Sequence, residues 1–225
     1  QIGDGIFQLY QNLASDLIER RAAWSMLALT DLSRLPDYEE LRGYYMYAPQ
    51  VNRGAPVDRN GTPIFFEIPQ SFESAQNDGE RWRWALDQTT KAVKGPSKAG
   101  MKDWEVFTRA SFLHSQFGVE TIGGYGVGPV FDESGREVEQ GVFALHTLTD
   151  DETIARLAIG VKRFPLSGQH TPLRLLESLN RDGSSYQEKA LEKLAEIYEN
   201  RRQYPRAVEK WRELIKKFGV GSNGY

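Results

Sequence analysis

Cysteine is absent from this 225-residue sequence, and histidine occurs only three times. The lack of cysteine excludes disulfides, thiolate metal sites and cysteine nucleophiles, although it leaves the compartment open. No apolar run approaches the ~20 residues that a membrane-spanning helix needs, so we expect no membrane span. The net charge of −3 gives no electrostatic reason to expect nucleic acid or an anionic membrane as a partner.

Recognisable catalytic motifs are also missing. His114, His146 and His170 fall in separate predicted elements and lack a metal-ligand spacing such as H-E-x-x-H. The sequence contains no G-x-S-x-G and no S-x-x-K, so no serine is marked as a nucleophile. Four glycines in residues 123–128 suit a phosphate-binding loop, but the residues after them predict a turn and a strand where such a loop needs a helix. We therefore expect no catalytic residue, no metal and no cofactor.

What is present is typical of a soluble globular protein, with 40% hydrophobic and 26% charged residues. The length allows one large domain or two small ones with a sizeable core. The opening residues QIGDG contain neither a starting methionine nor the basic region of a signal peptide. Because the sequence also closes on a loop-like GVGSNGY, we expect a fragment or mature product of a larger protein.

The sharpest pattern lies in residues 185–219, which predict two helices folded against each other. Ser185 and Glu188 form a capping box at the start of the first helix. Pro205 predicts that this helix stops by about Gln203, and it fits the first turn of the next helix. The range ends on a glycine, where a C-terminal cap is expected. The second helix carries a stripe of Ala207, Val208, Trp211, Leu214, Ile215 and Phe218.

The first of these helices resembles the opening half of a tetratricopeptide repeat, which has a period of ~34 residues and a W-x2-L-G-x2-Y…A-x3-F…P pattern. Leu191 occupies the first large apolar position. Leu194 and Ala195 replace Leu-Gly, and Tyr198 matches the tyrosine.

The second helix continues the resemblance. Ala207 matches the small residue at the helix crossing, and Trp211 takes the Phe position, whereas Gly219 falls near the expected Pro. The match covers about a sixth of the chain, and an ordinary helical hairpin is the alternative. The resemblance implies a mainly α fold of TPR-like antiparallel helix pairs, an α-α superhelix spanning residues 1–225 as one helical-repeat domain or fragment.

Elsewhere, apolar residues at helical spacing predict further helices. Thr149 and Glu152 form a second capping box ahead of a stripe that includes Ile154 and Leu157. Residues 5–35 are either a degenerate second repeat or one more helix pair. The expected helices are residues 5–35, 78–93 with Asp78 as cap, 102–117, 149–164 and 171–180.

The expected helix at 78–93 contains Arg81-Trp82-Arg83-Trp84, a pattern that could stack on nucleic-acid bases. Adjacent helix positions face different ways, so the simpler interpretation is one core tryptophan and one partly exposed tryptophan. The acidic net charge favours this second interpretation.

Two segments interrupt the helices. Residues 43–72 contain four prolines and predict an irregular segment with a hairpin turn at Asp58-Arg59-Asn60-Gly61. This turn lacks the remaining ligand positions of an EF-hand, so we do not interpret it as a calcium loop. Residues 120–147 predict a second hairpin that turns at Asp132-Glu133-Ser134-Gly135. Both segments are expected to be extended inserts that project from a helical body.

Residues 145–225 also resemble the helical-repeat part of very large bacterial alpha-2-macroglobulin-like proteins, through DDETIARLAIGVKRF and the helix pair that follows. In that family the repeats precede large β-domains. The resemblance implies an exported bacterial parent protein, located in the periplasm or cell envelope, in which this part is a scaffold.

The sequence therefore favours a non-enzymatic protein-interaction or scaffold module with a protein or peptide as partner. Stacked helix pairs leave a groove that is lined mainly by the first helix of each pair. For the named pair we expect Glu192, Glu196 and Asn200 to line it. The alternative is a hydrolase-like enzyme with a site between the helical body and the irregular segments, for which His114 and His146 are the first candidates.

Overall fold

The computed structural model describes residues 57–93, 95, 98–117, 144–157 and 159–219. In these ranges the chain is mainly helical with a small two-stranded sheet, which confirms the predicted mainly α class. The expected helices at 5–35 and the expected turn at 132–135 lie outside the described residues.

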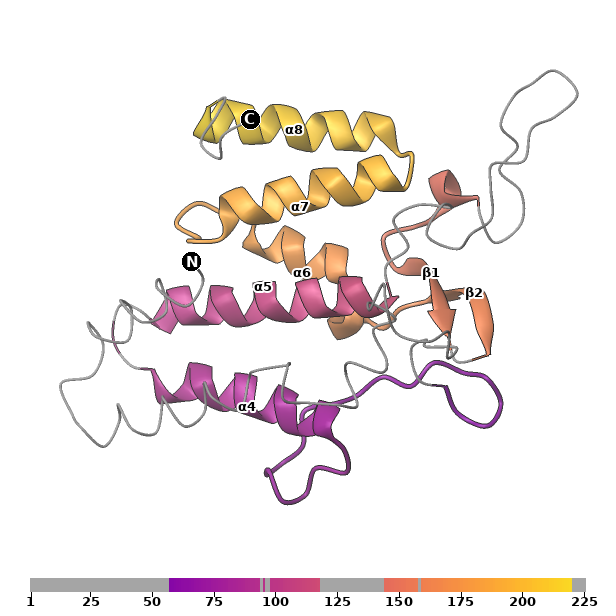
Figure 1. Cartoon of the computed structure of the whole chain (residues 1–225). Coiled ribbons are helices and arrows are strands. Elements are labelled where there is room, and N and C mark those ends of the chain that lie inside the picture. Colours follow the sequence, from indigo (N-terminus) through magenta and orange to yellow (C-terminus); the bar gives the residue numbers. More distant parts are fainter. Residues whose placement is uncertain (1–56, 94, 96–97, 118–143, 158, 220–225) are drawn as a thin grey trace, which may run out of the picture.

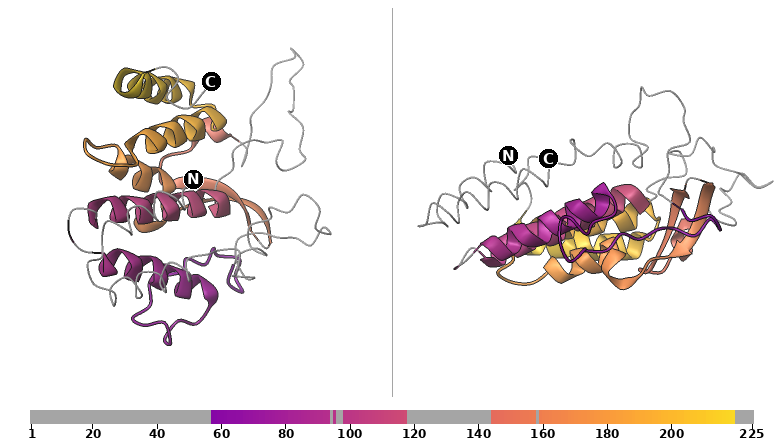
Figure 2. Two further views of the ribbon diagram at one scale, coloured as in Figure 1. Left: turned by 60° about the vertical axis from the view of Figure 1, so that its left-hand side comes forward. Right: turned by 90° about the horizontal axis from the view of Figure 1, so that it is seen from below.

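In the described part of the chain, five helices lie side by side in chain order, and a β-hairpin lies to one side of this stack, next to the helix ends (Figures 1 and 2). Between the second and third helices the chain passes through η4 (Leu145–Thr147), the hairpin and η5 (Gly168–His170). The helices are α4 (Asp78–Ala92), α5 (Lys98–Phe117), α6 (Pro172–Leu179), α7 (Gln187–Asn200) and α8 (Tyr204–Phe218). The strands are β1 (Glu152–Leu157) and β2 (Gly160–Pro165).

The predicted helix pair is present as α7 and α8, and its connection explains why the chain turns sharply. Arg202 adopts a left-handed φ of 58°, and Pro205 lies in the first turn of α8, where its missing N–H leaves no helix hydrogen bond unmade. Gly219 follows α8 with a φ of 86°, and its N–H donates to Ile215 O at 2.9 Å. The turn and the C-terminal stop were both predicted.

Two predicted caps were wrong. The N-cap of α7 is Tyr186, and no side chain caps this helix, so Ser185 and Glu188 do not form a capping box. Instead, Tyr186 N donates to Ser184 Oγ at 3.3 Å. The N-cap of α7 is therefore one residue later than predicted. In α4 the cap is Asn77 and not Asp78, because Asn77 Oδ1 accepts from Glu80 N at 2.9 Å.

The predicted helix at 149–164 is wrong, because this stretch forms the antiparallel pair β1–β2. Glu152 lies opposite Pro165 and Leu157 opposite Gly160. Gly160 has a φ of 126°. The run Thr153 to Ala155 is buried throughout, and a continuously buried run has no periodicity that separates a strand from a helix. Thr149 N does donate to Glu152 Oε2 at 3.0 Å, but this contact precedes a strand.

The described residues form two hydrophobic clusters, and α5 contributes to both. The aromatic core lies between α4, α5 and the hairpin, with Trp82, Trp104, Phe112 and Phe117 as its largest members. The aliphatic core lies between α5, α6, α7 and α8 and consists of Ala110, Leu173, Leu176, Leu179, Ala190, Leu194, Ile197, Tyr198 and Ala207.

The two tryptophans of α4 follow the simpler interpretation. Trp82 is fully buried and packs against Phe112 with ring centroids 4.7 Å apart, whereas Trp84 is half-buried at the edge of the Phe72 ring. Within the described residues, no helix has the length and apolar character needed to cross a membrane.

The described part of residues 43–72 is irregular, with one isolated bridge between Val57 and Pro63. The predicted turn at Asp58 is confirmed, because Asp58 Oδ1 accepts from Asn60 N at 2.8 Å and Thr62 N at 2.9 Å. Gly61 has a φ of 79° and lies under the side chain of Ile159, so a Cβ at this position would clash with it. The turn is thereby seated against the tip of the β-hairpin.

Candidate functional site

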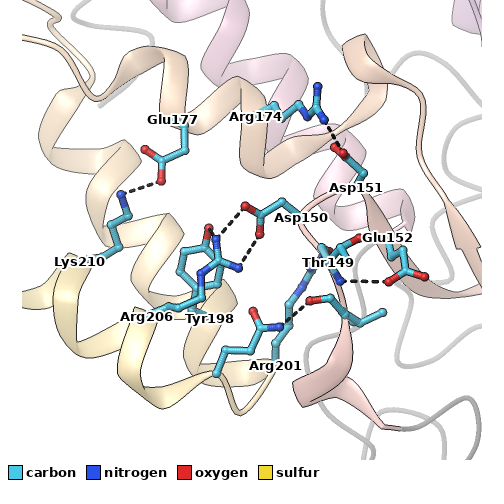
Figure 3. A network of polar contacts seen from close by, with 12 residues as sticks. Thr149, Asp150, Asp151, Glu152, Arg174, Glu177, Tyr198, Arg201, Arg206 and Lys210 are labelled. Atoms are coloured by element: carbon cyan, nitrogen blue, oxygen red, sulfur yellow. Dashed lines mark hydrogen bonds and ion pairs between the residues drawn. The ribbon is translucent and has the colours of Figure 1, made fainter.

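A network of polar contacts is built on four consecutive residues, 149–152 (Figure 3). Each of the four binds an arginine from a different place: the C-terminal end of α7, α8, α6 and β2. The pairs are Thr149 O with Arg201, Asp150 with Arg206, Asp151 with Arg174 and Glu152 with Arg163. We call this cluster the arginine junction.

At its centre, Asp150 and Arg206 form a two-bond pair with N···O distances of 2.6 and 2.7 Å. Arg206 Nη2 also donates to the hydroxyl of Tyr198 at 2.7 Å, and the guanidinium lies 4.1 Å from the Tyr198 ring centroid. The hydrogen bond from Arg206 lowers the pKa of Asp150, and burial raises the pKa of Tyr198. Asp150 is therefore a charged anchor and not a proton-transfer group near neutral pH.

Glu152, the last acid of the arginine junction, is likewise paired with an arginine. Glu152 accepts from Arg163 Nη2 at 2.7 Å, and this bond together with that from Thr149 N lowers the pKa of Glu152 to about 2. Next to the arginine junction, Nε2 of buried Gln203 donates to Leu148 O at 2.7 Å. The arginine junction thus holds the hairpin against the α7–α8 corner.

The predicted enzymatic candidates occupy different environments. His114 lies on α5 and is buried, and desolvation with the nearby charges of Lys193 and Arg201 lowers the pKa of His114 to about 3. The imidazole is therefore neutral at physiological pH. His146 lies exposed in η4.

The third histidine joins the irregular segment to the helical body. His170 is buried; its Nδ1 lies 2.7 Å from Ser167 Oγ and its Nε2 lies 3.0 Å from Phe66 O. The His170 ring also packs on Phe65, with centroids 4.9 Å apart. A serine hydroxyl beside an imidazole is the first element of a nucleophile–base pair. Here the same imidazole also fixes the backbone of the irregular segment through Phe66 and Phe65.

The described part of the chain contains no group of three or more His, Cys, Asp or Glu that could hold a metal ion. Comparison with protein-family models, with curated proteins and with solved structures found no match. The assignment of a role therefore depends on the chain's own geometry.

The predicted groove residues Glu192, Glu196 and Asn200 lie one helical turn apart on α7. At 100° per residue they fall on the side opposite the buried Leu194 and Tyr198. All three are half-buried, and Glu196 Oε2 lies 3.4 Å from Lys193 Nζ. This face is the polar side of a helix whose other side belongs to the aliphatic core.

Only part of the predicted apolar stripe on α8 packs against the interior. Ala207 is buried and Trp211 packs against the aliphatic core. Val208, Ile215 and Phe218 are instead exposed by 43%, 48% and 37%. The physical reason is that the buried side of α8 is rotated away from the centre of its apolar stripe, toward half-buried Lys210 and Leu214.

The arginine junction, the Ser167–His170 contact and the Phe66–His170 contact were missed in the sequence. Asp150 and Arg206 are 56 residues apart and Phe66 and His170 are 104 apart, so no local spacing marks these two contacts. Ser167 and His170 are only three residues apart, but they match no nucleophile motif. The acidic run Asp150-Asp151-Glu152 was the available signal, and it was interpreted as the start of a helix.

Proposed function

We propose that this chain is a non-enzymatic protein-interaction or scaffold module built from TPR-like helix pairs. The observation that carries the proposal is the order of packing: α5 contacts α6, α6 contacts α7, and α7 contacts α8 most extensively. Helical repeats stack in this way, each unit touching its neighbours in the chain, and the resulting extended surface binds peptides or other domains.

The character of the polar clusters supports the same proposal. The acids of the arginine junction are paired with cations and join one element to another. Buried Asp103 likewise binds Arg181 and accepts from Ser184 Oγ at 2.8 Å, which ties α5 to the connection between α6 and α7. These charges serve to assemble the stack. We further propose, from the resemblance of residues 145–225, that the module belongs to a larger bacterial protein of the alpha-2-macroglobulin-like class.

The proposed binding face on the stack includes the α7 residues Glu192, Glu196 and Asn200. Replacing all three with alanine is expected to abolish cross-linking of a protein or peptide partner from an envelope extract of the source bacterium. Thermal unfolding is expected to stay unchanged, because the three side chains lie opposite the aliphatic core.

The matched control is Lys98→Ala with Lys102→Ala, which changes exposed charges on α5. Equal capture by the triple variant and the wild type would remove this face from the proposal. The alternative of a hydrolase-like enzyme stays a prediction, with Ser167 and His170 as the pair to test first.

A further inference from the structure

The outer side of α8 carries a line of apolar side chains that face solvent. Tyr204, Val208, Ile215 and Phe218 are exposed by 57%, 43%, 48% and 37%, and Trp211 is half-buried between them. Steps of four and three residues along a helix fall on one side of it. We call these five residues the outer stripe of α8. A continuous exposed apolar patch of this kind is typical of an interaction site.

The position of α8 in the stack explains why the outer stripe is uncovered. Helices α5, α6 and α7 each contact a helix on both sides. Within the described ranges, α8 has such extensive helix contacts with α7 alone, and it forms the last layer in Figure 1. The outer stripe is thus the surface on which a further helix would lie if the stacking continued by one layer.

The charges along α8 indicate which kind of helix fits. On the side toward the core, Arg206, Lys210 and Lys217 are each paired with a carboxylate, from Asp150, Glu177 and Glu213. The opposite edge of the outer stripe carries Arg212 and Lys216, which are exposed and form no ion pair within the described part of the chain. Exposed Glu209 lies on the same edge, three residues before Arg212, so this edge carries two cations and one carboxylate and is positive on balance.

A second copy of this chain suits this edge poorly. Two copies of α8 that pair antiparallel about a two-fold axis bring the same edge of each copy together, so Arg212 and Lys216 meet an edge that is itself positive on balance. Like charges in such contact cost affinity, whereas carboxylates at these positions would steer and orient a partner.

We propose that the outer stripe of α8 binds one amphipathic helix of a partner protein, and that aspartate or glutamate residues bordering this helix pair with Arg212 and Lys216. The bound helix contributes an apolar line at the same four-and-three spacing, as in other complexes in which a helix fills an apolar groove. This partner chemistry deepens the proposed interaction function and rests on it, but it concerns α8 and not the polar face of α7.

The probe is a pair of synthetic 20-residue helical peptides with identical leucine lines, one bordered by glutamates and the other by lysines. Fluorescence anisotropy with the full chain is expected to show at least tenfold tighter binding of the glutamate peptide. Added salt is expected to reduce this preference, because exposed ion pairs are screened. Replacing Val208 and Ile215 with serine is expected to weaken both peptides, since the apolar contact is lost.

The decisive variant is Arg212→Glu with Lys216→Glu, which is expected to invert the preference in favour of the lysine peptide. The matched control, Lys98→Glu with Lys102→Glu, changes the same number of charges on α5 and is expected to leave the preference as in the wild type. Inversion separates a charge-bordered docking site from mere apolar adhesion, and circular dichroism verifies that each variant is folded.

Three outcomes overturn the inference: neither peptide binds the wild type, the charge reversal leaves the preference unchanged, or sedimentation shows a dimer that the Val208–Ile215 substitution dissolves. The Glu192, Glu196 and Asn200 variant is expected to bind the glutamate peptide normally. If peptide binding at α8 fails while the α7 variant abolishes capture, this inference is removed and the proposed function stands. If peptide binding at α8 succeeds while the α7 variant captures its partner normally, the α7 face is removed from the proposed function and this inference stands.

Discussion

The two hydrophobic cores consist of different types of residue, although α5 contributes to both. The aromatic core packs Trp82, Trp104 and Phe112 against a β-hairpin and an irregular segment. The aliphatic core joins helices through leucine and alanine, with Ala190 and Ala207 fully or nearly buried. Small residues let helix backbones approach closely, which suits a regular stack. Large aromatic rings fill the irregular space that a hairpin leaves against a helix.

The difference shows where regularity comes from in this chain. Helices α6, α7 and α8 pack by a repeated rule, in which each one lays an apolar side on the next. The hairpin has no such rule, and it is held by aromatic packing and by the arginine junction. Removing a large side chain therefore tests the aromatic core, and adding volume at a small buried residue tests the close helix contact in the aliphatic core.

The largest effect is expected in the aromatic core. Trp82→Ala should lower the free energy of unfolding by about 3–5 kcal/mol, because it empties a fully buried site. Trp84→Ala, two residues along the same helix, is the matched control and should cost much less, since Trp84 is half-buried. Urea denaturation measures both, and equal losses would contradict the assignment of Trp82 alone to the core.

A smaller effect is expected from crowding the aliphatic core. Ala207→Leu should cost about 1–3 kcal/mol, because the added side chain has no space where α7 and α8 cross. Ala99→Leu on the exposed side of α5 is the control and should be close to neutral. If thermal melts find Ala207→Leu neutral as well, then the two helices do not approach closely at this residue.

The smallest effect concerns the link between the two regions. A double-mutant cycle with Asp150→Asn and Arg206→Met should give a coupling of about 1 kcal/mol near pH 7. Asp151 and Arg174 form the control pair, which should couple by less than about 0.5 kcal/mol because Arg174 is 59% exposed.

The pH dependence of that coupling has a definite sign. The folded chain holds the pKa of Asp150 below its ordinary value. The stabilisation is therefore present above the ordinary aspartate pKa and disappears as the pH falls through the lowered one. A coupling that is unchanged well below this range would show that the two side chains interact by packing alone.

The sequence was most informative where local rules decide the structure. Pro205, Gly219 and the stripe from Leu191 to Tyr198 located α7 and α8, since helix stops and periodicity are read within a few residues. The Asp58 turn was predicted for the same reason. The buried half of α8 was not, because the stripe is wider than its contact with α7 and the sequence does not tell which edge is covered.

The rest depended on distant partners. Thr153 and Ile154 belong to a strand because Gly160 pairs back on Leu157 and because α5 lies beneath, as when Thr153 Oγ1 donates to Phe117 O. Asp150 and Arg206 are 56 residues apart and meet only in the folded arrangement. No local pattern contains that information, so the arginine junction could not be predicted, and the hairpin was missed because its buried run suits a helix equally well.

The arrangement of residues 149–152 has one further consequence for how the molecule comes apart. Four successive residues bind four separate elements, because their contacts reach the end of α7, α8, α6 and β2. Unfolding of any one of these elements displaces this short segment and weakens its contacts with the other three. The β-hairpin and the C-terminal helices should consequently melt as one cooperative unit, despite resting on different cores.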